Sequence, residues 1–107
     1  MIYKINTDNF KLSTKASEYL DSQTDKLKRY LPDYATDLPL LQVSIRHHEK
    51  RQVFEGSMVL HLPQQSLAAH FSAPDVIEGL KIGFGKIEHE LSTLKGKHFI
   101  NEGDGLR

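Results

Sequence analysis

The stretch that decides the fold is residues 41–71, LQVSIRHHEKRQVFEGSMVLHLPQQSLAAHF. Apolar and polar residues alternate in three runs, and each run is long enough for a β-strand. The apolar positions of the three runs are Leu41, Val43 and Ile45, then Phe54, Met58, Leu60 and Leu62, then Leu67, Ala69 and Phe71. This pattern predicts three consecutive antiparallel strands.

The pairing of these strands can be predicted from the turns between them. A tight first turn would place Ile45 opposite Phe54, and a second turn through residues 63–66 would place Met58 opposite Phe71. Both registers bring apolar side chains together, and a slip of one residue would send each set to the other face. The agreement predicts a meander with one buried face and one mostly polar face.

A strand and an amphipathic helix come before the meander. The first residues alternate like a strand, with Tyr3 and Ile5 on one face. Ser13 is a good N-cap, because its hydroxyl can accept a hydrogen bond from a backbone N–H of the first helical turn. Apolar residues then recur at helical spacing until Pro32 ends the helix. Residues 32–39, with two prolines and two aspartates, are predicted to form a loop.

A second amphipathic helix follows the meander. Asp75 is followed three residues later by Glu78, which is close to a capping box, and Pro74 is expected in the first turn. An apolar stripe with spacings of three and four then runs as far as Leu94. Gly96 is expected to end this helix.

Gly79, Gly83 and Gly85 lie inside the second helix. Each weakens a helix by up to ~1 kcal/mol relative to alanine, which is tolerable if the apolar stripe docks firmly or if the glycines allow a close approach. The element order therefore predicts an α+β fold, β-α-β-β-β-α, with a four-stranded sheet and two helices packed on one face. We expect one domain over residues 1–96 and a flexible tail over residues 97–107.

The composition is that of one folded domain of 107 residues, with 38% hydrophobic and 26% charged residues. The chain has no cysteine, which excludes a disulfide framework, a thiolate metal site and a thiol nucleophile. The N-terminal residues lack an apolar run of signal-peptide length, and no stretch approaches the ~20 apolar residues of a membrane span. We therefore expect a cytoplasmic protein without a membrane partner.

The formal net charge is zero, because 14 basic residues balance 14 acidic ones. The whole molecule therefore has no strong field to attract nucleic acid, and any site for a polyanion must be local. One candidate is the run Lys26-Leu27-Lys28-Arg29 at the end of the first helix. These cations could hold phosphates, but cations in a last helical turn are also stabilised by the helix dipole, and the residues alone favour a solvated cap.

A second candidate is the turn Arg46-His47-His48-Glu49-Lys50-Arg51. It could contact an RNA backbone, or it could be a charged turn that protects against aggregation, and the sequence leaves both interpretations open. His47 and His48 are adjacent in a strand, so their side chains point to opposite faces and cannot bind one metal together.

The other histidines offer no clear chemistry. His61 is expected to face Ala68 and to lie diagonally to His70, and a metal or acid–base role would need a third ligand or a nucleophile. We interpret both as surface histidines and predict no catalytic residue, no metal and no cofactor. The Gly-x-Gly at residues 83–85 lies inside a helix and does not follow a strand, so it is not a phosphate loop.

Several short segments occur in a characteristic order. They are Phe10-Lys11-Leu12-Ser13 leading to Tyr19-Leu20, Lys26-Leu27-Lys28-Arg29, Arg51-Gln52-Val53 with Glu55, His61-Leu62-Pro63, and Lys86-Ile87-Glu88-His89-Glu90-Leu91. In order and spacing they resemble the ribosome hibernation-promoting factors, a family that includes the ribosome-associated inhibitor. The resemblance covers residues 1 to about 98.

Members of that family bind the small ribosomal subunit where mRNA and tRNA would lie. The resemblance therefore implies a translation inhibitor that acts by steric exclusion and is not an enzyme, with small-subunit rRNA as its partner. It implies no DNA partner and a monomer off the ribosome. The family's rRNA contacts are basic side chains near the end of the first helix and along the second. With the basic turn included, the expected RNA-binding residues are Lys26, Lys28, Arg29, Lys50, Arg51, Lys86, His89, Lys95 and Lys97.

The sequence departs from the family pattern at three cation positions, which here are Gln23, His89 and Thr93. Each phosphate contact contributes about −0.7 to −0.9 to the slope of log K against log salt, so losing two or three cations should weaken ribosome binding. The alternative interpretation is a diverged, non-ribosomal protein-interaction module with the same fold. The ribosomal hypothesis expects a continuous positive stripe across both helices, and the alternative does not.

Overall fold

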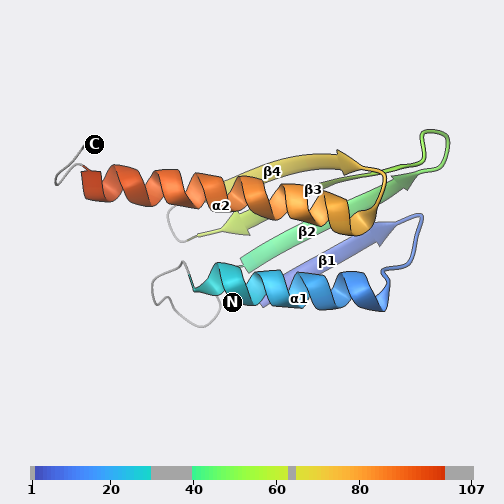
Figure 1. Ribbon diagram of the computed structural model, residues 1–107, viewed down its shortest axis with the longest axis horizontal. Helices are drawn as coiled ribbons and strands as arrows, with labels where there is room; N and C mark the ends of the chain where they lie inside the picture. Colours follow the sequence, from blue (N-terminus) through green and yellow to red (C-terminus); the bar gives the residue numbers. More distant parts are fainter. Residues whose placement is uncertain (1, 30–39, 63–64, 101–107) are drawn as a thin grey trace.

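The computed structural model describes residues 2–29, 40–62 and 65–100, and the side chains of residues 3–29, 40–62 and 65–93. Its elements are β1 (Ile2–Asp8), α1 (Thr14–Lys28), β2 (Leu40–His48), β3 (Val53–His61), β4 (Ser66–Ala73) and α2 (Val76–Ile100). Both helices lie on one face of a four-stranded sheet (Figure 1). The predicted α+β fold and the order β-α-β-β-β-α are confirmed.

The sheet is mixed, with strand order β1-β2-β3-β4. β1 is parallel to β2, because α1 carries the chain back between them, whereas β2, β3 and β4 form an antiparallel meander. The predicted meander is confirmed, and the side chains predicted to face the core are on the buried face. The outer strands are β1 and β4, and α2 packs over β4 and β3.

The predicted registers of the meander are wrong by two residues. His47, not Ile45, lies opposite Phe54, and Met58 lies opposite Ala69 instead of Phe71. In the first hairpin the cause is a longer turn: residues 49–52 form a four-residue loop, in which Gln52 takes a left-handed conformation with φ of 54°. In the second hairpin the pairing shifts in the opposite sense: His61 lies opposite Ser66, and the N–H of Leu62 donates to the carbonyl of Gln65 at 2.8 Å. A shift of two residues keeps every side chain on its predicted face, so the buried and polar faces are nevertheless correct.

The core lies between the sheet and the helices. Leu41, Val43 and Ile45 of β2 are almost fully buried. The residues opposite them in the sheet point to the same buried face. Tyr3 and Ile5 of β1 are partly buried against this core. The buried hydrophobic cluster contains Leu20, Leu27, Leu41, Val43, Ile45, Met58, Leu60, Leu67, Ala69, Phe71, Leu80, Phe84, Ile87 and Leu91.

α1 begins as its sequence predicts. The Ser13 hydroxyl accepts a hydrogen bond from the backbone N–H of Ala16, at 3.1 Å. The Tyr3 hydroxyl donates to the Asp21 carboxylate and so joins β1 to the middle of the helix. α1 ends at Lys28, and the predicted continuation to Pro32 and the predicted loop lie outside the described residues.

α2 begins at Val76, after Pro74, and continues beyond the predicted end. The Asp75 carboxylate accepts hydrogen bonds from the N–H groups of Ile77 and Glu78, so Asp75 is the N-cap and Pro74 precedes the helix instead of opening it. The helix runs past Gly96 to Ile100, so the expected stop at Gly96 is wrong. No helix in the described part of the chain is long and apolar enough to cross a membrane.

The glycines of α2 explain how the helix approaches the sheet. A Cβ atom on Gly79 would lie 2.8 Å from the Phe71 ring, and one on Gly83 would lie 3.0 Å from the same ring. On β3, a Cβ atom on Gly56 would meet Phe71 at 2.6 Å. Three glycines therefore make room for one buried aromatic ring. For Gly79 and Gly83, this is the close approach that the sequence allows. Gly85 is different, because a Cβ there would meet nothing within 4 Å.

Candidate nucleic-acid interface

The basic end of α1 is exposed. Lys26 and Lys28 lie in the last turn, and Arg29 caps the helix through its backbone N–H, which contacts the carbonyl oxygens of Leu27 and Lys26. These three cations, the α1 end group, form no ion pair with any described side chain. They are therefore free to contact phosphates, and they also offset the negative end of the helix dipole.

The hairpin group consists of Lys50 and Arg51, in the loop between β2 and β3. Arg51 donates to the Glu55 carboxylate at 2.9 Å, and His48 contacts the other oxygen of the same carboxylate at 2.5 Å. The hydrogen bond from Arg51 is the main reason that the pKa of Glu55 is below its ordinary value. The charge of Arg51 is thus partly offset, whereas Lys50 has no ion pair in the described part of the chain.

Lys86 of α2 is turned toward the edge of the sheet. Its Nζ donates a hydrogen bond to the backbone carbonyl of His70 on β4, at 2.8 Å. His89 is exposed one turn further along the helix. Lys95 and Lys97 belong to α2, but their side chains are outside the described residues.

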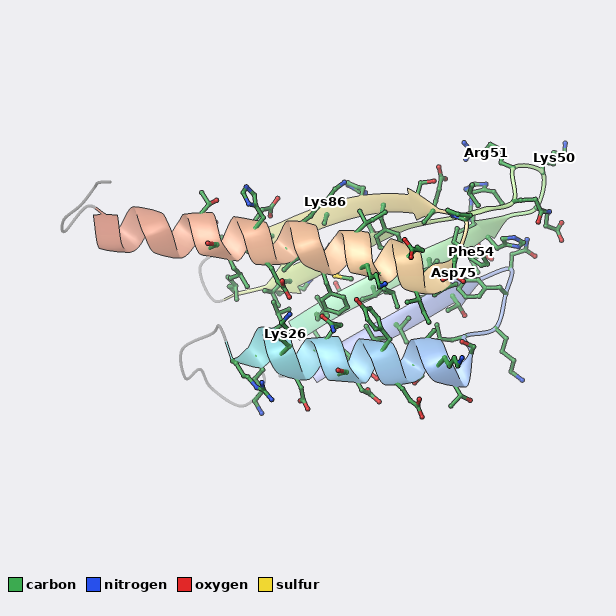
Figure 2. All side chains as sticks on the ribbon, in the orientation of Figure 1. Lys26, Lys50, Arg51, Phe54, Asp75 and Lys86 are labelled. Atoms are coloured by element: carbon green, nitrogen blue, oxygen red, sulfur yellow. The ribbon has the colours of Figure 1, made fainter. Side chains whose placement is uncertain are left out.

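The cations whose side chains the structure describes do not lie on one surface. Figure 2 shows Lys26 on α1, Lys86 on the side of α2 that is turned away from α1, and the hairpin group at the other end of the sheet. Burial and then the carboxylates of Glu88 and Glu78 raise the pKa of Tyr19, so acidic groups of α2 face α1. Among the described residues, the cations form separate groups. The expected continuous stripe stays a prediction, because it would include Lys95 and Lys97, whose side chains lie outside the described residues.

A second surface, which our sequence analysis missed, lies on the face of the sheet opposite the helices. Side chains of all four strands surround a hollow there, in cross-strand rows that the registers define. We call it the sheet hollow; it is lined by Asn6, Ser44, Arg46, Ser57, His70 and Lys86, among others. The signal in the sequence was the small serines at central polar positions, but their alignment depends on the register.

An aromatic cluster lies at the hairpin end, on the helix side of the sheet. The His47 ring stacks on Phe54 with centroids 4.5 Å apart, and Phe10 meets Phe54 edge-on at 5.0 Å. His48 instead lines the sheet hollow, so the prediction that the two adjacent histidines face opposite sides is confirmed. The cluster is partly buried and fixes the start of α1 against the sheet.

His61 and His70 do not lie as predicted. His61 pairs with Ser66 instead of Ala68, and His70 lies opposite Ser57. The His61 ring contacts the Ser66 hydroxyl at 3.1 Å and the Gln42 amide oxygen at 2.7 Å. Ser66 and Gln42 are exposed, so these contacts lie on an open surface. No three histidine or acidic side chains in the described ranges come together as a metal site.

Comparisons with known proteins give similarity at the level of structure. No family model matches the sequence, and no curated protein matches it either. A ribosomal subunit interface protein from Coxiella burnetii superposes with a TM-score of 0.69 at 18% identity, over 90% of this chain and 99% of that one.

The N-terminal domain of Protein Y from Thermus thermophilus superposes with a TM-score of 0.72 at 13% identity, over 88% of this chain and 99% of that one. At these identities the similarity is one of fold. The chain therefore has the fold of a ribosomal subunit interface protein and of the Protein Y N-terminal domain, as the sequence resemblance predicted.

Proposed function

We propose that this protein binds the small ribosomal subunit and inhibits translation by occupying the place of mRNA and tRNA. The observation that carries the proposal is the fold, which this chain shares over 90% of its length with a ribosomal subunit interface protein. The sequence resemblance to the hibernation-promoting factors supports the same function independently of the superposition. The protein acts by occupancy in the cytoplasm, without catalysis, and is a monomer off the ribosome.

The α1 end group is the best candidate for the main rRNA contact. Lys26, Lys28 and Arg29 are exposed, adjacent and without acidic partners among the described side chains. Lys50 can make a further contact with the rRNA backbone, whereas Arg51 would share its charge between the rRNA and Glu55. The resemblance adds positions along α2, which are Lys86, His89, Lys95 and Lys97.

The expected affinity is modest, because the cations are few and separate. A contact by the three residues of the α1 end group and Lys50 would give a log K slope of about −3 against log salt, from about −0.7 to −0.9 per phosphate. Three positions that carry cations in the resembling family are here Gln23, His89 and Thr93. Binding should therefore be strong only at low salt.

Sedimentation with purified ribosomal subunits tests the proposal. The protein should move with small subunits and not with large subunits at low salt, and the bound fraction should fall steadily as salt rises. A protein that stays at the top of the gradient with both subunits, even at low salt, would overturn the proposal.

A second candidate function is a non-ribosomal protein-interaction module. It is favoured by the separation of the basic groups and by the acidic side of α2, where Glu78 and Glu88 lie near Tyr19. This candidate predicts that the protein ignores both subunits at every salt concentration, so the same gradients separate the two functions.

A further inference from the structure

The sheet hollow is a second place where this protein can bind a ligand, on the face of the sheet that carries no helix. Two cross-strand rows form it. One row runs through Asn6, Ser44, Ser57 and His70, and the neighbouring row runs through Asp8, Arg46, Glu55 and Ser72. Serines occupy the centre of the first row, and their small side chains leave the hollow open.

The carboxylates of the hollow already have partners. Asp8 accepts a hydrogen bond from the Nε of Arg46 at 2.8 Å, and Glu55 is held by Arg51 and His48. The contact with Asp8 leaves both Nη groups of Arg46 available to a ligand. Asp8 offsets part of the charge of Arg46, as Glu55 does for Arg51, but the Nη donors of Arg46 remain.

Lys86 supplies a second cation from the other side. Its Nζ donates one hydrogen bond to the carbonyl of His70 and is thereby held over the edge of β4. Two of the three N–H donors of the ammonium group remain. It forms no ion pair with any described acidic side chain. β2 and β4 are two strand spacings apart, roughly 10 Å, so Arg46 and Lys86 can approach one group above Ser57 from both sides.

The remaining polar groups can donate hydrogen bonds. The hydroxyls of Ser44, Ser57 and Ser72 have no hydrogen-bond partner within the described part of the chain. Donors that converge between two cations fit a compact anion with several acceptor oxygens, and arginine and lysine are the usual phosphate ligands. No phenylalanine or tyrosine is in the two polar rows, and the serines at their centre offer hydroxyl donors instead of a stacking surface.

We propose that the sheet hollow binds a phosphate group, with Arg46 and Lys86 as the charged ligands and Ser57 beneath it. The group can come from a free phosphorylated molecule or from an RNA backbone, which present the same oxygen chemistry. The site can be tested without ribosomes, because it lies on a different face from the α1 end group.

Amide chemical shifts of the free protein, measured while inorganic phosphate is added at constant pH and ionic strength, test the site. The amides of Ser44, Ser57, His70 and Ser72 should shift together and saturate. Arg46→Gln and Lys86→Gln should each weaken binding about tenfold, because each removes a charge-assisted hydrogen bond. Ser57→Val should also weaken it, because valine removes a donor and narrows the hollow.

Lys81→Gln is the matched control, because it removes the same charge from the exposed surface of the same helix, outside the hollow. It should leave binding unchanged. The proposal is overturned if these amides do not saturate, or if Arg46→Gln and Lys86→Gln bind like the wild type while their spectra show a folded protein. A second titration with hexauridylate assigns the source: the same shifts identify an RNA backbone, and saturation by phosphate alone identifies a free phosphorylated molecule.

Discussion

The Nζ of Lys86 donates a hydrogen bond to the backbone carbonyl of His70, 2.8 Å away, and thereby ties α2 to the outer edge of β4. The sequence resemblance implies that Lys86 contacts rRNA. This lysine lies beside the sheet hollow, whereas the α1 end group lies at the C-terminal end of α1. The sheet hollow and the α1 end group are therefore two basic surfaces, each of which can be tested alone.

The glycines of α2 should respond to alanine in opposite directions. A methyl group on Gly79 would lie 2.8 Å from the buried Phe71 ring, and overpacking of this kind costs about 1–3 kcal/mol. Gly85→Ala meets open space and should stabilise the protein by up to ~1 kcal/mol through helix propensity. Urea unfolding of both variants measures the difference. Equal effects would show that α2 does not press against Phe71.

Thr24 should be improved by valine. Its hydroxyl is buried in α1 without a hydrogen-bond partner among the described residues, and the residue is only 6% exposed. Valine keeps the shape and removes the unsatisfied polar group, so Thr24→Val should raise the free energy of unfolding by about 1 kcal/mol. Thr24→Ser is the control, because it keeps the hydroxyl and deletes the methyl group, and it should be less stable than the wild type. A less stable valine variant would mean that the hydroxyl has a partner.

The pKa of Glu55 should depend on Arg51. In the folded protein this pKa lies below the ordinary value of 4.5, first because Arg51 donates a hydrogen bond to the carboxylate. A lowered pKa means that the contacts of Glu55 stabilise the fold above about pH 4.5 and are lost as the pH falls through the lower folded value. An NMR titration of the Glu55 carboxyl should find a midpoint below 4.5, and Arg51→Gln should move it upward. A midpoint that does not move would contradict the ion pair.

Much of the fold was predictable because it depends on the alternation of apolar and polar residues in the strands and on the N-cap residues of the helices. The alternation in β2, β3 and β4 fixes which side chains are buried, and Ser13 and Asp75 mark the helix starts. The register was not predictable, because a pairing that differs by two residues buries the same side chains. The register of the first hairpin depends on a four-residue loop, in which Gln52 adopts a left-handed conformation without the glycine that usually signals one.

The site was only partly predictable for the same reason. That the α1 end group is exposed follows from helical periodicity, and the sequence resemblance drew attention to it. The sheet hollow needs the alignment of Ser44 with Ser57 and of Ser57 with His70, which the wrong register hides. The turn of Lys86 toward β4 depends on where α2 crosses the sheet, and helical periodicity does not specify that position.

Removing two charges from the α1 end group should weaken ribosome binding. Lys26→Gln with Arg29→Gln should lower the salt slope by about 1.5, since each phosphate contact contributes about 0.7 to 0.9. The matched control is Lys11→Gln with Lys15→Gln, which makes the same change in net charge at the opposite end of α1. Sedimentation of both double variants with small subunits measures the effect. If the two lose binding equally, the contact is a matter of net charge and not of the α1 end group.

The most direct test of the account is competition on the small subunit. Small subunits carrying a labelled mRNA and tRNA are mixed with increasing amounts of the protein, and the retained label and the bound protein are measured together. The account predicts that mRNA and tRNA are lost in step with protein binding. Protein that binds the subunit while both labels stay in place, or that does not bind at all, would contradict it.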